Sequence, residues 1–200
     1  MVRNLLTFTL ISLLSSNQKN LESININSSE VDICQLAPVN ETETESDIFK
    51  DYRKGAEIYL SRDIFTGTNI TADQLTNAAK RAYECYGVLV PIELALAQAQ
   101  MESGMGKKGL SPKNNPYNVG EFDNGTKITF TSTQEGIDAY YNLISKNYMN
   151  GRSVEKVLYN FVDYRGNRYA SDTLYESKIK KQYNFIKRWI TKNWKNKSNK

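Results

Sequence analysis

The sequence contains no histidine, and this absence excludes several classes of enzyme. Ser/His/Asp and Cys/His nucleophile systems, HExxH zinc sites and most catalytic zinc sites all need an imidazole. Only 2 cysteines are present, and neither belongs to a CxxC pair. No metal and no cofactor are therefore expected, and any catalysis must depend on carboxylates, hydroxyls or lysine.

Long apolar runs are also absent. No segment reaches the roughly 18 consecutive apolar residues that a membrane-spanning helix needs. The run from Leu5 to Leu14 follows Arg3 and precedes small polar residues, so residues 1–16 are predicted to be a secretory signal peptide. The alternative is an apolar N-terminal helix of a cytosolic protein. We expect a secreted, periplasmic or wall-associated protein without a transmembrane segment.

The hydrophobic content of 40% and charged content of 24% are average for one globular domain. Residues 17–46 are rich in Asn, Ser, Glu and Thr, which is typical of a polar linker. The domain is expected at 47–195, followed by a basic tail at 196–200. In an exported chain Cys34 and Cys85 would pair; a buried free thiol at Cys85 is the alternative.

Helical signals dominate the domain. Apolar residues recur at helical spacing, and cap residues such as Thr71, Ser132 and Ser153 precede several of the periodic segments. Ser132 and Glu135 have the spacing of a capping box. Residues 91–103 begin at a proline and are apolar almost all round, which predicts a helix buried in the core. Helices are expected at 47–60, 71–86, 91–103, 136–148, 153–162 and 172–194.

The helical period disappears between residues 107 and 131. Asn124-Gly125 is a dipeptide favoured in tight hairpin turns, so a short β-hairpin is expected around it. The fold class is therefore predicted to be mostly α (α+β), with a small β-flap and no internal repeat.

Glu102 is the most informative residue. It lies at the C-terminal end of the buried helix, on the face that also carries Ala95 and Gln98. Removal from water and the negative end of the helix dipole are expected to raise its pKa and keep it protonated near neutral pH. A general acid has this property. The alternative is a glutamate that reaches solvent from the last turn.

Several segments resemble the glucosaminidase domain of glycoside hydrolase family 73. LAQAQMESGMG at 96–106, with the later NN at 114–115 and NVG at 118–120, is similar to LAQAxxESGxG followed by NNxFGIK. EFDNG at 121–125 is similar to the EYxNG of that family's β-flap, and YASDTLY at 169–175 to its YATDPxY segment.

The resemblance covers roughly residues 71–189. It implies a lysozyme-like helical domain with a short β-hairpin flap over the cleft. It also implies a peptidoglycan hydrolase that cleaves the β-1,4 glycosidic bond after N-acetylglucosamine. A lytic transglycosylase giving anhydro-muropeptides and a non-catalytic wall-binding protein are the alternatives.

The resemblance also implies roles for single carboxylates. Glu102 matches the catalytic acid that protonates the leaving sugar's glycosidic oxygen. Glu121 matches a second carboxylate that activates water or stabilises the oxocarbenium ion, and Asp123, on the same side of a strand, is its rival. Glu135 is better explained as the N3 residue of a capping box. The flap is shorter than in the family, so the choice between Glu121 and Asp123 stays open.

The candidate substrate-binding residues are aromatic rings that stack on sugars and amides that bond to N-acetyl groups. For Tyr164 the alternative is an ordinary surface tyrosine, and for the asparagines at 114, 115 and 118 it is turn chemistry. The candidates are Gln98, Asn115, Tyr117, Tyr164 and Tyr169.

Basic residues gather at the C-terminal end of the sequence. The helix predicted from residue 172 should pack through Leu174, Ile179, Tyr183, Ile186 and Ile190. Its lysines 180, 181, 187 and 192 should then face solvent. Such a face suits anionic wall polymer, although a solvated face without a partner is the alternative. The expected partner is the peptidoglycan glycan strand, bound by a monomer; no nucleic-acid-binding module is present.

Overall fold

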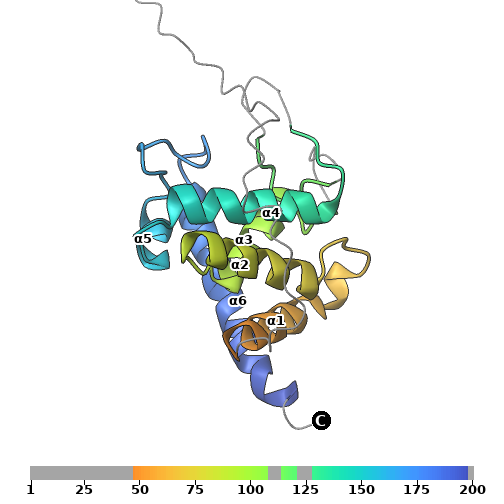
Figure 1. The fold of residues 1–200 in the computed structure, drawn as a ribbon. Coiled ribbons are helices and arrows are strands. Elements are labelled where there is room, and N and C mark those ends of the chain that lie inside the picture. Colours follow the sequence, from red (N-terminus) through yellow and green to blue (C-terminus); the bar gives the residue numbers. More distant parts are fainter. Residues whose placement is uncertain (1–46, 108–113, 121–127, 198–200) are drawn as a thin grey trace, which may run out of the picture. The chain divides into compact units, whose positions relative to one another are not determined.

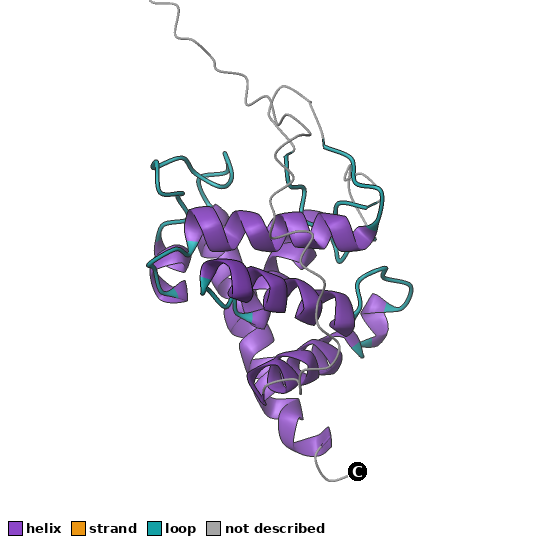
Figure 2. Ribbon diagram, viewed as in Figure 1, coloured by secondary structure: helices purple, strands orange, loops and turns teal. Residues whose placement is uncertain are grey.

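The computed structural model describes residues 47–107, 114–120 and 128–197. Helices dominate these residues (Figures 1 and 2), so the mostly α class is confirmed. In chain order they are α1 (Asp47–Leu60), the 3-10 helix η2 (Asp63–Phe65), α2 (Ala72–Tyr86), α3 (Ile92–Ser103), α4 (Thr133–Leu143), the π-helix η3 (Ile144–Tyr148), α5 (Val154–Tyr159) and α6 (Tyr175–Lys197).

Parts of the sequence prediction lie outside the described residues. They include the signal peptide, the linker and the turn of the predicted hairpin at 124–125. Within the described ranges there is no strand, only an isolated antiparallel bridge between Val162 and Arg168. The same ranges contain no helix long and apolar enough to cross a bilayer.

The first three α-helices follow their local signals closely. The hydroxyl of Thr71 accepts a hydrogen bond from the Gln74 backbone N–H at 3.1 Å, and the Gln74 side chain accepts from the Thr71 N–H at 2.9 Å. This is a complete capping box. Gly87 ends α2, and Gly104 ends α3, both in the left-handed conformation that glycine adopts easily. The predicted boundaries are confirmed here to within one residue.

The C-terminal helices differ from the prediction at their ends. The helix expected at 136–148 starts at Thr133, and its last residues form the π-helix η3. The helix expected to reach residue 162 stops at Tyr159. Just beyond its end, the backbone oxygens of Asn160 and Val162 accept from the Arg152 guanidinium at 2.7 and 2.6 Å.

The capping box expected at Ser132 is only half formed. The Ser132 hydroxyl accepts from the Glu135 N–H at 3.2 Å. The Glu135 carboxylate instead accepts from the backbone and hydroxyl of Thr131, both at 2.7 Å. These contacts lower the pKa of Glu135, with the Thr131 hydroxyl as the largest cause. The side chain therefore stabilises the start of α4 from one residue further upstream.

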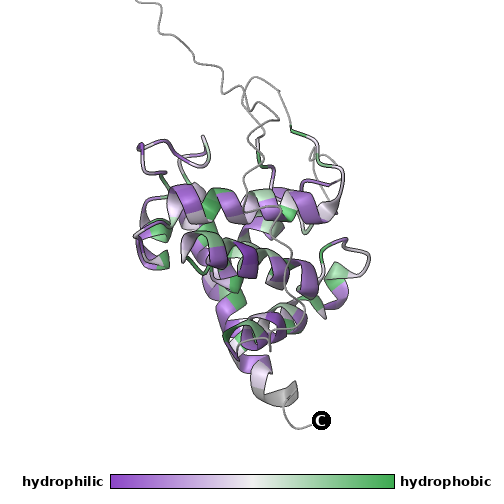
Figure 3. Ribbon diagram, viewed as in Figure 1, coloured by the Kyte–Doolittle hydropathy of each residue, from purple (hydrophilic) through white to green (hydrophobic). Residues whose placement is uncertain are grey.

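The core is built around α3, which is buried along nearly its whole length. It packs against α6 and α1. The outer helix α4 shows hydrophilic and hydrophobic positions in alternation (Figure 3), as expected for an amphipathic helix with one buried face. A helix apolar on every side is thus enclosed by amphipathic ones, and its last turn carries Glu102 to the edge of the core.

Helix α6 covers α3 through the predicted apolar stripe. Ile179, Tyr183, Ile186 and Ile190 are buried, as expected. Leu174 is 59% exposed, contrary to the prediction. The physical reason is that α6 starts only at Tyr175, so Leu174 lies before the helix and outside its stripe.

Candidate active site

The end of α3 is held in place by Ser103. Its hydroxyl donates to the backbone oxygen of Pro116 at 2.6 Å and accepts from the Gly106 N–H at 2.7 Å. The side chain is 1% exposed. Ser103 therefore ties the helix end to the loop at 114–120 and brings that loop beside Glu102.

Glu102 lies half-buried in the last turn of α3. The Tyr175 hydroxyl donates to its Oε1 at 3.0 Å. The Asn118 amide donates to its Oε2 at 3.3 Å and to its backbone oxygen at 3.1 Å. Each carboxylate oxygen is thus held by a donor from a different part of the chain, which fixes the direction of the side chain.

Asn118 reaches Glu102 because of its backbone conformation. Its φ is 53°, in the left-handed region where asparagine is among the few tolerated non-glycine residues. The turn chemistry considered for this asparagine and its contact with Glu102 therefore belong to the same conformation. Asn115, and not Asn118, is among the substrate-binding residues predicted from the sequence. The contact of Asn118 with the Glu102 carboxylate was therefore not predicted.

A buried hydrogen-bond chain supports Glu102 from behind. The Tyr140 hydroxyl donates to Oε1 of Gln98 at 2.6 Å, and Nε2 of Gln98 donates to the Tyr175 hydroxyl at 3.1 Å. Because Tyr175 accepts from Gln98, its own proton is directed at Glu102. Gln98 is 0% exposed. It therefore orients Tyr175 and has no surface for a ligand in this conformation.

The two tyrosines of this hydrogen-bond chain stay protonated. Burial raises the pKa of Tyr175 well above its ordinary value, and Tyr169 and then Glu102 raise it further. Burial likewise raises the pKa of Tyr140. Both phenols consequently serve as hydrogen-bond donors near neutral pH.

A pocket of about 590 Å³ opens beside Glu102. Its residues come from the end of α3, from residues 170–172 and from the first half of α6. They are Met101, Glu102, Ala170, Ser171, Asp172, Tyr175, Lys178, Lys181 and Gln182. Glu102 is therefore the acid of α3 that reaches a space large enough for a ligand.

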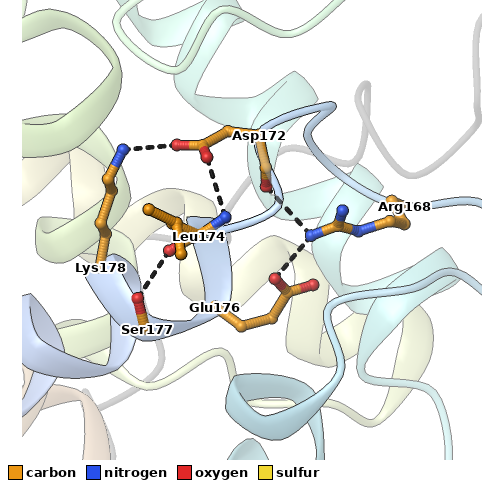
Figure 4. Close-up of polar contacts among 6 residues, drawn as sticks. All are labelled: Arg168, Asp172, Leu174, Glu176, Ser177 and Lys178. Carbon is orange, nitrogen blue, oxygen red and sulfur yellow. Dashed lines mark hydrogen bonds and ion pairs between the residues drawn. The ribbon is translucent and has the colours of Figure 1, made fainter.

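The α6 side of the pocket is held by exposed charges (Figure 4). The Asp172 carboxylate accepts from the Leu174 N–H at 2.8 Å and from the Lys178 ammonium at 2.6 Å. Arg168 donates to the Asp172 backbone oxygen and to the Glu176 carboxylate, at 3.0 and 2.7 Å. The Lys178 contact, followed by the Leu174 N–H, lowers the pKa of Asp172.

The predicted sugar-binding tyrosines differ in how deeply they are buried. Tyr169 is half-buried; its hydroxyl donates to the Tyr117 backbone oxygen at 3.2 Å, and its ring stacks 5.4 Å from that of Tyr175. Tyr117 is 0% exposed and stacks 3.7 Å from Tyr140. Tyr164 is 66% exposed, and its ring contacts the Arg165 guanidinium at 5.0 Å. Tyr169 and Tyr117 thus support the site from behind.

The Asn115 amide bonds to backbone groups of its own loop and also donates to the Ile128 oxygen at 3.4 Å. Its oxygen accepts from the Val119 N–H at 2.9 Å, and its nitrogen donates to the Val119 oxygen at 2.8 Å. The side chain is 0% exposed. This geometry corresponds to the turn alternative rather than to an exposed amide.

The two candidate second carboxylates, Glu121 and Asp123, lie outside the described residues. In the part of the chain that is described, no group of three or more Cys, Asp or Glu side chains could hold a metal ion. Tyr175 is the further residue that the sequence missed. It is the last tyrosine of the YASDTLY segment, but the motif gave no reason to rank it above Tyr169.

The sequence matches a protein-family model. The model described as Glucosaminidase, mannosyl-glycoprotein endo-beta-N-acetylglucosaminidase, covers residues 76–188, which is more than half of the chain. Glu102, Asn118 and Tyr175 all lie within that range. No curated protein matches the sequence.

Proposed function

The chain belongs to the glucosaminidase family, and from this premise we propose that it hydrolyses the β-1,4 bond after N-acetylglucosamine in peptidoglycan strands. Membership of the family supports a glycoside hydrolase. The observation that carries the proposal is Glu102, which is held by donors at both oxygens and lines a pocket of about 590 Å³. In the proposed reaction Glu102 is the general acid.

The hydrogen bonds to Glu102 suit an acid that must release its proton. Oε2 has the longer contact, at 3.3 Å from Asn118, and is proposed to carry the proton. When that proton passes to the glycosidic oxygen, the C–O bond breaks and Glu102 becomes a carboxylate. Tyr175 and Asn118 then stabilise the charge that develops in the transition state, which is how fixed donors lower a barrier.

The second half of the reaction needs a water molecule. The water attacks the oxocarbenium-like centre and passes its proton to a second carboxylate. Glu121 is proposed for this role and Asp123 is the rival, as the sequence suggests. Tyr164 is proposed to stack on a sugar ring, while Gln98, Asn115, Tyr117 and Tyr169 support the groups that contact substrate.

A lytic transglycosylase is the second candidate. Among the described residues that line the pocket, Asp172 is the other carboxylate, and it is engaged by Lys178 at 2.6 Å. A transglycosylase needs no second acid to activate water, because the sugar's own hydroxyl attacks. Mass spectrometry of muropeptides after digestion separates the two, since the anhydro product is lighter by one water.

The variant Glu102→Gln tests the acid. Glutamine keeps the volume of the side chain but does not supply the proton, so turnover of purified peptidoglycan should fall by ~100-fold or more. Glu84→Gln is the matched control, because Glu84 is an exposed glutamate on α2. Turnover of Glu102→Gln within a few-fold of wild type, at equal folded concentration, would refute the assignment of Glu102 as the general acid.

The location outside the cytoplasm is part of the proposal. Cys85 is disulfide-bonded, and disulfides persist mainly in oxidising compartments. Cys34, the other cysteine of the sequence, lies outside the described residues. A wall hydrolase would meet its substrate in such a compartment, which agrees with residues 1–16 acting as a signal peptide.

A further inference from the structure

We infer that Lys181 binds a carboxylate of the glycan substrate and so makes the enzyme selective for acidic strands. The inference rests on the proposed function. It goes further in naming a substrate feature, an anionic substituent beside the scissile sugar, and the residue that recognises it.

The position of Lys181 on α6 is the first step. Tyr175, Lys178, Lys181 and Gln182 follow one another at spacings that place them on a single face of the helix. All four line the pocket that also contains Glu102. The lysines of the basic end were expected to face solvent and to suit an anionic wall polymer. Lys181 is exposed, as expected, but its exposed side chain borders this pocket.

The charges around the pocket are the second step. The positive charge of Lys178 is matched by Asp172 at 2.6 Å. Lys181 has no acidic group within ion-pair distance among the residues that the structure describes. Its neighbour on the same face is another cation, Lys178, and like charges at this spacing are unfavourable. An ammonium in this position is therefore available to an anion from outside the chain.

The chemistry of the substrate class supplies such an anion. A chain of N-acetylglucosamine alone is neutral and offers nothing to an ammonium beyond hydroxyls and amides. Peptidoglycan strands carry carboxylates, either on stem peptides or, where the peptide is missing, on the lactyl group of the muramic sugar. Both sources present the same group to Lys181, and the experiment must separate them.

The experiment compares three soluble glycans of equal length. The first carries stem peptides with free carboxylates, the second is the same material with its carboxylates converted to amides, and the third is peptide-free with a free lactyl carboxylate. The enzymes are wild type, Lys181→Gln and the control Lys180→Gln, which removes an exposed lysine that does not line the pocket. The readout is kcat/KM at low and high salt.

The expected effect is modest because the ion pair would be exposed to solvent. Lys181→Gln should lower kcat/KM on the peptide-bearing acidic strands by about 3- to 5-fold at low salt. It should leave the amidated strands unaffected, and Lys180→Gln should match wild type on all three. Loss on the peptide-free strands as well would show that Lys181 binds either carboxylate. Loss confined to the peptide-bearing strands would identify the stem peptide.

Other outcomes overturn the inference in distinguishable ways. If wild type cleaves acidic and amidated strands equally, or if Lys181→Gln loses as much on amidated strands, then Lys181 recognises no carboxylate, although the hydrolase proposal stands. If wild type cleaves none of the three glycans, the proposed function fails, and this inference fails with it.

Discussion

The two walls of the pocket are stabilised by different kinds of interaction. On the α3 side, Gln98 and Ser103 are buried and form hydrogen bonds between uncharged groups. On the α6 side, Arg168, Asp172 and Lys178 are exposed and interact through charges. Both walls border the pocket that contains Glu102.

The difference teaches which wall determines the geometry of the site. A buried polar group that loses its partner costs ~1–3 kcal/mol, because water does not replace the bond. An exposed ion pair contributes about 0–1 kcal/mol and is screened by salt. The α3 wall should therefore fix the position of Glu102, while the α6 wall should adjust how the pocket meets a charged ligand.

The largest effect is expected from Gln98→Leu. Leucine removes the acceptor of the Tyr140 hydroxyl and the donor to Tyr175, which keeps its contact with Glu102. The free energy of unfolding should therefore fall by roughly 2–4 kcal/mol. Chemical denaturation measures the loss. Adding Tyr140→Phe removes the hydroxyl that is left without an acceptor, and the double variant should regain part of the stability. A double variant less stable than Gln98→Leu would show that the buried chain does not stabilise this wall.

Tyr175→Phe should affect catalysis more than folding. It deletes the donor to Oε1 of Glu102, and hydrogen bonds to charged groups are worth ~1.5–3 kcal/mol, so kcat should fall by about 10-fold or more. KM should change little. The alkaline limb of the pH–rate profile should move to higher pH, because the ionised form of Glu102 loses a donor.

Tyr183→Phe is the matched control for Tyr175→Phe. Tyr183 is also a buried tyrosine of α6, but it does not line the pocket. A loss of kcat without any movement of the pH profile would mean that Tyr175 only supports the fold. Equal losses of kcat in Tyr175→Phe and Tyr183→Phe would also mean that Tyr175 only supports the fold.

How well the sequence predicts a feature depends on how far apart in the sequence the residues that form it lie. Helices α1 to α3 were predicted to within one residue. For α2 the reason is that its cap, Thr71, bonds to Gln74 only three positions away. Glu102 was found because its own helix is apolar all round. The Gln98 chain was not predicted, since it joins residues 42 and 77 positions apart.

The misplaced helix ends have the same origin. The end of α5 is set by Arg152, which lies before the helix and bonds to carbonyls beyond it. The late start of α6 leaves Asp172 in the loop before the helix, bonded to Leu174 and Lys178. Local periodicity contains no information about either contact, so these boundaries could not be read from the sequence.

The smallest effect is expected from Asp172→Asn on the exposed wall. Because Lys178 and the Leu174 N–H lower the pKa of Asp172 in the folded chain, its stabilising contribution is present above the ordinary aspartate pKa. It is lost as the pH falls through the lowered value. In thermal unfolding, the stabilities of wild type and Asp172→Asn should therefore differ slightly near neutral pH and low salt, and converge in acid or high salt.

Asp51→Asn, which removes an exposed carboxylate of α1, is the control and should show no such convergence. If Asp172→Asn instead destabilises as strongly as Gln98→Leu, the contrast between the two walls is wrong, and the charged wall also fixes the site.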